Sequence, residues 1–220
     1  MDSRVTTGRI PSRCLDWLAS SRLEFLLNVL RDGKMSFFSA HLPVMATWPD
    51  VRKTGPAGLT VNLTIKGIGL LPVPELLADY TDIFESTLAE ARTCPWKESL
   101  ANRVEASARL YSDVGHFDPT ALGGLEIFEG KAAGNMRDNP RASLLYSGMK
   151  SGPAGMEYIS FQVNGTIEIL EKENPYYRFL LASRKLFEFE KFHIFQTDYP
   201  FGYMVRVDEV LDKSPFPRQR

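Results

Sequence analysis

Hydrophobic and polar positions recur with two different periods along this chain, and the changes of period mark the predicted elements. Leucines recur at helical spacing through residues 16–31, and Gly33 ends that helix. Residues 34–42 and 58–71 are rich in β-branched and aromatic residues and are bounded by Gly and Pro, which predicts strands. The connection 43–58 is rich in Pro and Gly and is predicted to be a loop.

A helical pattern returns between residues 74 and 111. Two amphipathic segments, each with an apolar face opposite charged side chains, are separated there by Cys94-Pro95. β character then resumes, and a hairpin turn is predicted at 199–202. The predicted strands span residues 124–129, 141–147, 157–170, 192–197 and 202–210, and further helices span 132–138 and 175–189. Because the helices are inserted between runs of strands instead of alternating with them, the pattern favours an antiparallel barrel or sheet, mainly β in the α+β class.

Length and composition narrow the class of protein. A chain of 220 residues fits a single domain, 1–220, with a helical insertion at about 74–111. A net charge of -1 gives no electrostatic reason to expect nucleic acid or an anionic membrane as a partner. No apolar run approaches the roughly 20 residues of a membrane span, and the N-terminus lacks an apolar signal core. With two cysteines, a reducing compartment is expected, and the protein is predicted to be cytoplasmic.

Few side chains form a recognisable reactive set. His41, His116 and His193 are widely spaced, so no metal site is predicted. His193 and Gln196 lie in an aromatic-rich run that could belong to the core, to an interface or to the edge of a substrate site. Glu126 is expected to be solvated, as is its neighbour Glu129. No Ser/His/Asp or Cys/His arrangement indicates a nucleophile, and the catalytic residue is unknown.

One junction has a specific chemical interpretation. A predicted strand ends at Glu129, and a predicted helix begins after Gly130-Lys131. The free amide N–H groups at a helix start favour an anion, whereas a lysine in the first turn is mildly unfavourable. That lysine is explained if its ammonium faces a bound phosphate. The alternative is that Lys131 extends into solvent from an ordinary connection.

The sequence around this junction resembles a known family. "GKAAGNMRDNPRASLLY", residues 130–146, is similar to a segment of the pyridoxamine 5'-phosphate oxidase-like, FMN-binding split-barrel proteins. In these proteins a lysine follows a strand, an Asn-plus-apolar pair follows within a turn, and Asn-Pro-Arg opens the next strand. "YISFQVNGTIEIL" resembles the strand after that, so the similarity covers roughly residues 120–170. It implies an antiparallel split β-barrel, here with an inserted helical region and peripheral helices.

The resemblance also implies a cofactor and a site. Lys131 would contact the phosphate of FMN, and Lys66 would supply a second basic group. The candidate cofactor-binding residues are Asn62, Thr64, Lys66, Gly130, Lys131 and Ala132. This chain has one more residue than usual between the lysine and the Asn-apolar pair, and the cofactor could be FMN, a deazaflavin or haem.

Three functions remain open from the sequence. The first is an FMN-dependent oxidoreductase acting on a small-molecule substrate, the second is a haem- or flavin-binding protein without turnover, and the third is a structural dimeric protein. A homodimer is expected, because the flavin of the family lies at a subunit interface and the aromatic-rich segment 176–203 offers apolar area.

Overall fold

A single antiparallel sheet organises the fold. The computed structural model describes residues 5–32, 39–50, 52, 60–152, 155–188 and 196–215. The strands are β1 (Val5–Thr7), β2 (Val44–Thr47), β3 (Asn62–Ile65), β4 (Ile68–Pro72), β5 (Phe117–Glu126), β6 (Arg141–Gly152), β7 (Gly155–Leu170) and β8 (Phe201–Asp212). Their order in the sheet is β3-β2-β6-β7-β8-β5-β4, with β1 paired to β8. No pairing joins β3 to β4 in the described part of the chain, so the barrel is open.

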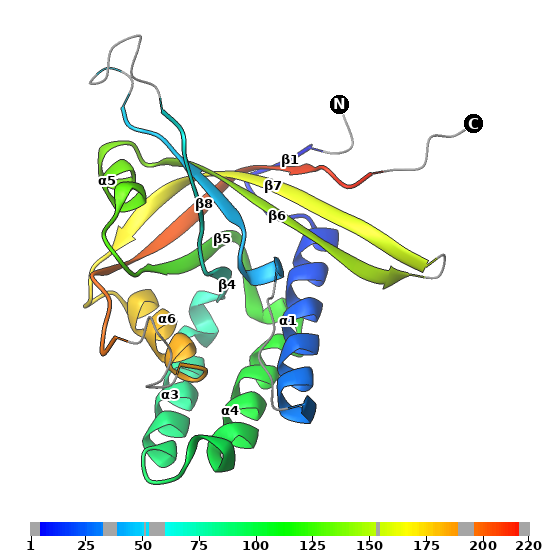
Figure 1. Cartoon of the computed structure of the whole chain (residues 1–220), viewed down its shortest axis with the longest axis vertical. Helices are drawn as coiled ribbons and strands as arrows, with labels where there is room; N and C mark the ends of the chain where they lie inside the picture. The colour runs from blue at the N-terminus through cyan, green and yellow to red at the C-terminus, as the bar shows by residue number, and fades with distance from the viewer. Residues whose placement is uncertain are drawn as a thin grey trace.

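Four of the five described α-helices form one layer, and the fifth lies apart from it. They are α1 (Ser12–Asp32), α3 (Pro74–Ala91), α4 (Trp96–Tyr111), α5 (Lys131–Asp138) and α6 (Pro175–Lys185), with short 3-10 turns η1 (Ser39–His41) and η2 (Val114–His116). Figure 1 shows α1, α3, α4 and α6 together on one side of the sheet, while α5 lies apart, beside the β2–β3 pair. The predicted fold, an antiparallel split barrel with an inserted helical region at 74–111, is confirmed.

Local sequence explains where several helices begin. Pro74 opens α3, and Pro175 opens α6, where a fixed φ suits the first helical turn and no N–H is lost from the ladder. The side chain of Asn174 caps α6 by accepting a hydrogen bond from the Tyr176 amide at 2.9 Å. Pro95 separates α3 from α4, as the sequence indicates. Among the described residues, no helix is long and apolar enough to cross a membrane.

The core lies between the sheet and the helical layer. β7 buries alternate residues, including Ile159, Phe161 and Val163, and β8 lies beside it along most of its length. The register between these strands shifts at Gly165. A Cβ there would lie 2.5 Å from the carbonyl oxygen of Arg206, so this close approach of two backbones requires glycine.

Some predicted strands are wrong or displaced. Part of 34–42 lies outside the described residues, and Ser39–His41 forms a 3-10 turn instead of a strand. The loop predicted at 43–58 contains β2, which forms because it pairs with β3 and also with distant β6. The single strand predicted at 58–71 is two strands, because β3 pairs with β2 whereas β4 pairs with β5.

The boundaries near the C-terminal hairpin also differ. The strand predicted at 192–197 lies mostly outside the described residues, and Gln196 is not in a strand. Phe201 and Gly202 belong to β8 instead of to a turn, since both residues pair with β5. β5 begins at Phe117, earlier than the predicted 124, because Phe117 is buried in the core despite its polar neighbours.

Candidate functional site

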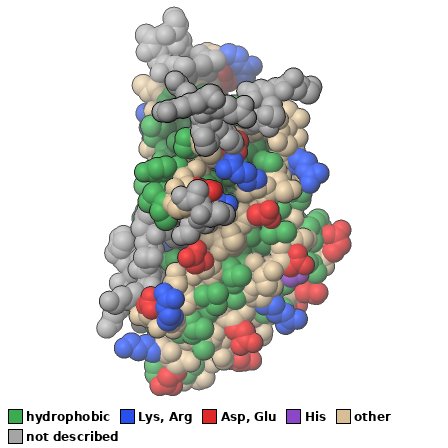
Figure 2. All heavy atoms as spheres, turned by 90° about the vertical axis from the view of Figure 1, so that its right-hand side faces the viewer, with side chains coloured by type: hydrophobic (Ala, Val, Ile, Leu, Met, Phe, Trp, Pro, Cys, Tyr) green, Lys and Arg blue, Asp and Glu red, His purple; other side chains and the backbone are tan. Residues whose placement is uncertain are grey.

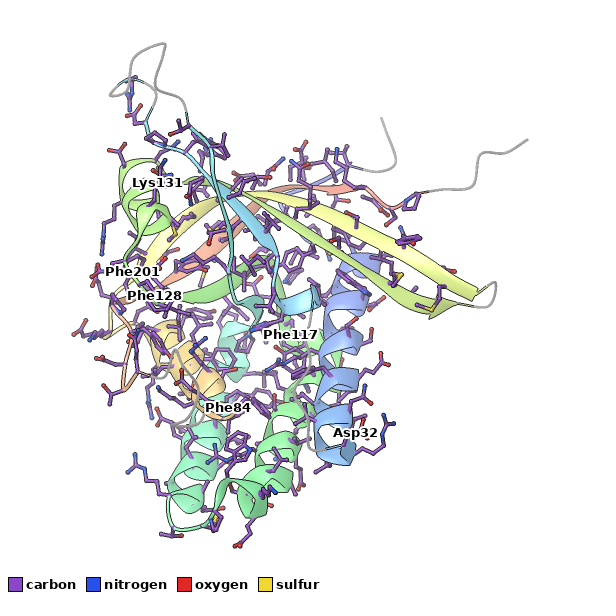
Figure 3. All side chains as sticks on the ribbon, in the orientation of Figure 1. Asp32, Phe84, Phe117, Phe128, Lys131 and Phe201 are labelled. Atoms are coloured by element: carbon purple, nitrogen blue, oxygen red, sulfur yellow. The ribbon has the colours of Figure 1, made fainter. Side chains whose placement is uncertain are left out.

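The junction between β5 and α5 has an uncapped helix start beside a lysine. Gly130 is the N-cap residue in an extended conformation, and no side chain of the described residues caps the helix. The first helical hydrogen bond runs from the Gly134 amide to the Gly130 carbonyl at 3.2 Å. Lys131 is exposed, and its Nζ donates to Thr60 Oγ1 at 3.3 Å. Figure 3 places Lys131 on α5, well away from the helical layer that contains Phe84. An ammonium, a hydroxyl and free amides therefore meet at one place.

A row of polar side chains continues from this junction along β3. Thr60, Asn62 and Thr64 alternate with exposed apolar residues, so they share one face of the segment. Asn62 pairs with the buried Thr47 of β2, whose Oγ1 accepts a hydrogen bond from Asn135 Nδ2 at 3.1 Å. That bond ties α5 to the sheet. Two of the predicted binding residues, Asn62 and Thr64, thus lie on the same face as Thr60, which Lys131 contacts.

Lys66 is at the other end of β3 and has a different partner. Its Nζ donates to Glu126 Oε2 at 2.6 Å, and the two side chains are 12% and 1% exposed. Glu126 also accepts hydrogen bonds from the amides of Ile127 and Phe128. The expectation that Glu126 is solvated is wrong, because this carboxylate folds back onto its own turn. β3 alone spans about 10 Å, so Lys66 and Lys131 do not converge on one phosphate.

The other predicted residues have more limited roles. Ala132 is buried, so only its backbone amide can contribute to a site. His193 lies outside the described residues, and Gln196 Nε2 donates to the Ile127 carbonyl at 3.1 Å. His116 Nδ1 lies 3.0 Å from the Leu110 carbonyl oxygen and 3.2 Å from Tyr80 Oη, contacts that fit a structural role. Within the described ranges, no group of three or more His, Cys, Asp or Glu residues could hold a metal ion.

Most of the described aromatic residues of 176–203 lie in the core. Tyr177, Phe179, Tyr199, Phe201 and Tyr203 are all buried in the core of the chain. The apolar side chains that the sequence suggested for a dimer contact are therefore mostly buried within the chain, among the described residues of this segment. Exposed apolar side chains gather elsewhere, on β2, β3 and β6.

The structure contains a second candidate site that the sequence did not predict. A cavity of about 640 Å³ lies between α1, α4, α6 and the β4–β5 ladder. Its walls come from segments far apart in sequence, so no local motif marks it. Gly67 and Gly69 line it, but their sequence context favours a bend between strands.

Comparisons with known proteins give similar solved structures only. No protein-family model and no curated protein matches the chain. A "putative pyridoxamine 5'-phosphate oxidase" of Lactobacillus delbrueckii is 15% identical with a TM-score of 0.42, over 94% of this chain and 96% of that one. An FMN-binding protein of Syntrophomonas wolfei is 8% identical with a TM-score of 0.44, over 92% and 93%. HutZ, the heme storage protein of Vibrio cholerae, is 9% identical with a TM-score of 0.39, over 86% and 94%.

Proposed function

We propose that this protein binds FMN and holds its phosphate at the start of α5. The observation that carries the proposal is the meeting of the Lys131 ammonium, the Thr60 hydroxyl and an uncapped helix N-terminus. A charged donor and free backbone amides are the groups that bind a phosphate dianion. The resemblance of residues 130–146 to FMN-binding split-barrel proteins agrees with this placement.

The neighbouring side chains suit the rest of the cofactor. Asn62 and Thr64 continue from Thr60 along β3, and both are partly exposed. Amide and hydroxyl groups in such a row can exchange hydrogen bonds with the hydroxyls of a ribityl chain. Lys66 is held by Glu126, so its part is to keep the far end of β3 in place and not to bind the phosphate.

Bound FMN would supply redox chemistry, and we propose an oxidoreductase that acts on a small-molecule substrate. In this proposal the chain grips the phosphate, orients the flavin and limits access of water to it. The same site could take a deazaflavin, which carries the same type of phosphate-bearing chain. A haem protein of this fold is the second candidate, and a structural dimer without cofactor is the third. The absorption spectrum of the purified protein separates a flavin from a haem.

We also propose that two copies associate through the outer face of β2, β3 and β6. Val44 pairs with Ile65 on one side and with Leu145 on the other, and all three side chains are exposed, as is Leu63. We call these four residues the apolar strip. A contiguous apolar strip that crosses three strands favours a self-complementary contact. Figure 2 shows the molecule from the right-hand side of Figure 1, a face on which acidic, basic and hydrophobic side chains are interspersed.

Replacing Lys131 tests the phosphate site. Lys131→Ala removes a charge-assisted contact, so FMN affinity should fall by about tenfold to hundredfold. Riboflavin, which lacks the phosphate, should bind the variant and the wild type equally. Lys97 is a matched control, because it is also an exposed lysine in the first turn of a helix. Lys97→Ala should leave both affinities unchanged. Fluorescence titration of each of the three proteins with each flavin measures the six dissociation constants.

The comparison has two outcomes that would contradict the proposal. Equal FMN affinity in Lys131→Ala and wild type would make Lys131 an ordinary solvated residue. A parallel loss of riboflavin affinity would show that the substitution disturbs the site as a whole and that no phosphate contact was removed.

A further inference from the structure

The cavity below the sheet is distinct from the proposed flavin site. It lies in the helical layer that Figure 1 shows beneath the sheet, whereas α5 lies to one side of that layer. None of the six predicted cofactor-binding residues lines it. Its volume of about 640 Å³ falls within the range of about 300–1,000 Å³ that is typical of small-molecule pockets.

Five aromatic side chains line the cavity. Rings are contributed by α1, α4, α6 and the turn after α6, and they are Phe25, Trp96, Tyr111, Phe179 and Phe187. Aliphatic side chains add to the apolar lining, and they are Val29, Leu42, Leu70, Leu100, Leu125 and Leu180. Flat rings that face a common space favour a flat apolar ligand, because offset and edge-to-face contacts add to the burial of apolar area.

Positive charge converges on one part of this space. Arg22 lines the cavity with its guanidinium 5.2 Å from the centre of the Phe25 ring and 5.5 Å from that of Phe187. Arg184 lies one turn before Phe187 on the same segment. Glu188 also lines the cavity, but it already binds Arg184, Lys185 and the Tyr199 hydroxyl. The charged side chains of the lining therefore leave an excess of positive charge.

Arg184 has one donor group that its neighbours do not use. Its Nε donates to Tyr199 Oη at 2.6 Å and to Glu188 Oε1 at 3.3 Å. Its Nη2 is buried and has no hydrogen-bond partner among the described residues. A buried donor without an acceptor costs free energy, and an anionic ligand would satisfy it.

Glycines keep the floor of the cavity open. Gly69 on β4 pairs with Gly123 on β5, and both line the cavity. A Cβ at Gly69 would lie 3.1 Å from His41 Nδ1. One at Gly123 would lie 2.5 Å from Cδ2 of the core residue Leu71 and 3.2 Å from Leu180 Cδ2. Side chains at these two positions would thus crowd residues of the lining.

We infer that this cavity binds a small aromatic carboxylate, with its ring among the five aromatic side chains and its carboxylate at Arg22 and Arg184. A planar carboxylate matches the two-pronged geometry of a guanidinium. Neutralisation of the excess charge favours this ligand over a neutral or a cationic one with the same ring. The site does not depend on the flavin proposal, because the two share no residue.

Two isosteric probes test the inference on the wild-type chain. 2-Naphthoate and its uncharged amide, 2-naphthamide, have the same ring system and differ in charge. Isothermal titration calorimetry should show 2-naphthoate binding at least tenfold more tightly than 2-naphthamide. Arg184→Gln should weaken 2-naphthoate by about tenfold to hundredfold and leave 2-naphthamide unchanged. Arg178→Gln is the matched control on α6, because Arg178 is exposed and does not line the cavity.

A third variant tests the location without altering any charge. Ser183 lines the cavity on α6, and Ser183→Phe would fill part of it. Both probes should then bind at least tenfold more weakly, while FMN affinity stays the same. The inference is overturned if the two probes bind equally, if 2-naphthoate does not bind, or if Ser183→Phe leaves the binding of both unchanged. Because the probe comparison needs no variant, it remains decisive even if Arg184→Gln fails to fold.

Discussion

The ion pair between Lys66 and Glu126 should contribute to stability more than to cofactor binding. Lys66→Met keeps the length and apolar stem of the side chain but leaves the Glu126 carboxylate, 1% exposed, without its ammonium. Removing one partner of a buried pair costs about 3–5 kcal/mol, and the 12% exposure of Lys66 places it near the lower value. For a chain of this size, about 3 kcal/mol corresponds to a fall in Tm of roughly 6–12 °C.

Urea unfolding of matched variants measures this effect. Lys172→Met removes an ion pair with Asp198 in which both side chains are about half exposed, so the free energy of unfolding should hardly change. The double variant Lys66→Met/Glu126→Gln should recover part of the lost stability. Glutamine carries no charge, and its carbonyl oxygen can still accept the hydrogen bonds of the Ile127 and Phe128 amides.

FMN titration of Lys66→Met tests whether Lys66 belongs to a structural ion pair or binds the cofactor. If the variant unfolds at the same urea concentration as wild type but binds FMN at least tenfold more weakly, Lys66 is a cofactor ligand. The Glu126 contact would then be secondary. Equal effects of Lys66→Met and Lys172→Met on stability would also refute the assignment of a buried structural pair.

Three further predictions follow from the described contacts. Asn135→Ala breaks the buried bond to Thr47 and should lower the free energy of unfolding by about 1–3 kcal/mol in urea titrations. Burial and the charges of Arg22 and Arg184 lower the pKa of His41 from 6.5 to about 3. The unfolded chain then binds a proton below pH 6.5 that the folded chain does not, so stability should hold above pH 6.5 and fall toward pH 3. At pH 5 the loss is about 2 kcal/mol, and His41→Gln should remove this part of the pH dependence. Leu145→Arg places a charge in the apolar strip and should convert a dimer to a monomer in light scattering, and a monomeric wild-type protein would refute that interface.

The parts of the fold that were predicted correctly have local signals. The helix α5 was expected at 132–138, because Gly130 precedes it and Asn139-Pro140 follows it. The strand β2 was missed because its four residues lie next to prolines, and because its stability comes from pairing with β3 and the distant β6. Pairing over such distances leaves little trace in a local pattern of polar and apolar positions.

The same limit applies to the candidate sites. Lys131 could be proposed as a phosphate ligand from the sequence, because the argument depends on a strand-to-helix junction a few residues long. The partner of Lys66 could not be proposed in this way, since Glu126 is 60 residues further along the chain. Nothing in the local pattern around Glu126 indicates that its carboxylate turns inward to two backbone amides and a lysine.

The inserted helical region explains why the chain has a cavity at all. Trp96, Leu100 and Tyr111 belong to α4, the second helix of the insertion, and they form one wall of the cavity. The opposite walls come from α1 and α6, and the floor comes from the paired glycines of β4 and β5. A split barrel without residues 74–111 would keep the α5 junction and the polar row on β3, but it would lose that wall. The insertion would therefore separate the two proposed sites on one sheet: the phosphate site at its edge, which needs no insertion, and the aromatic-carboxylate site beneath it, which does.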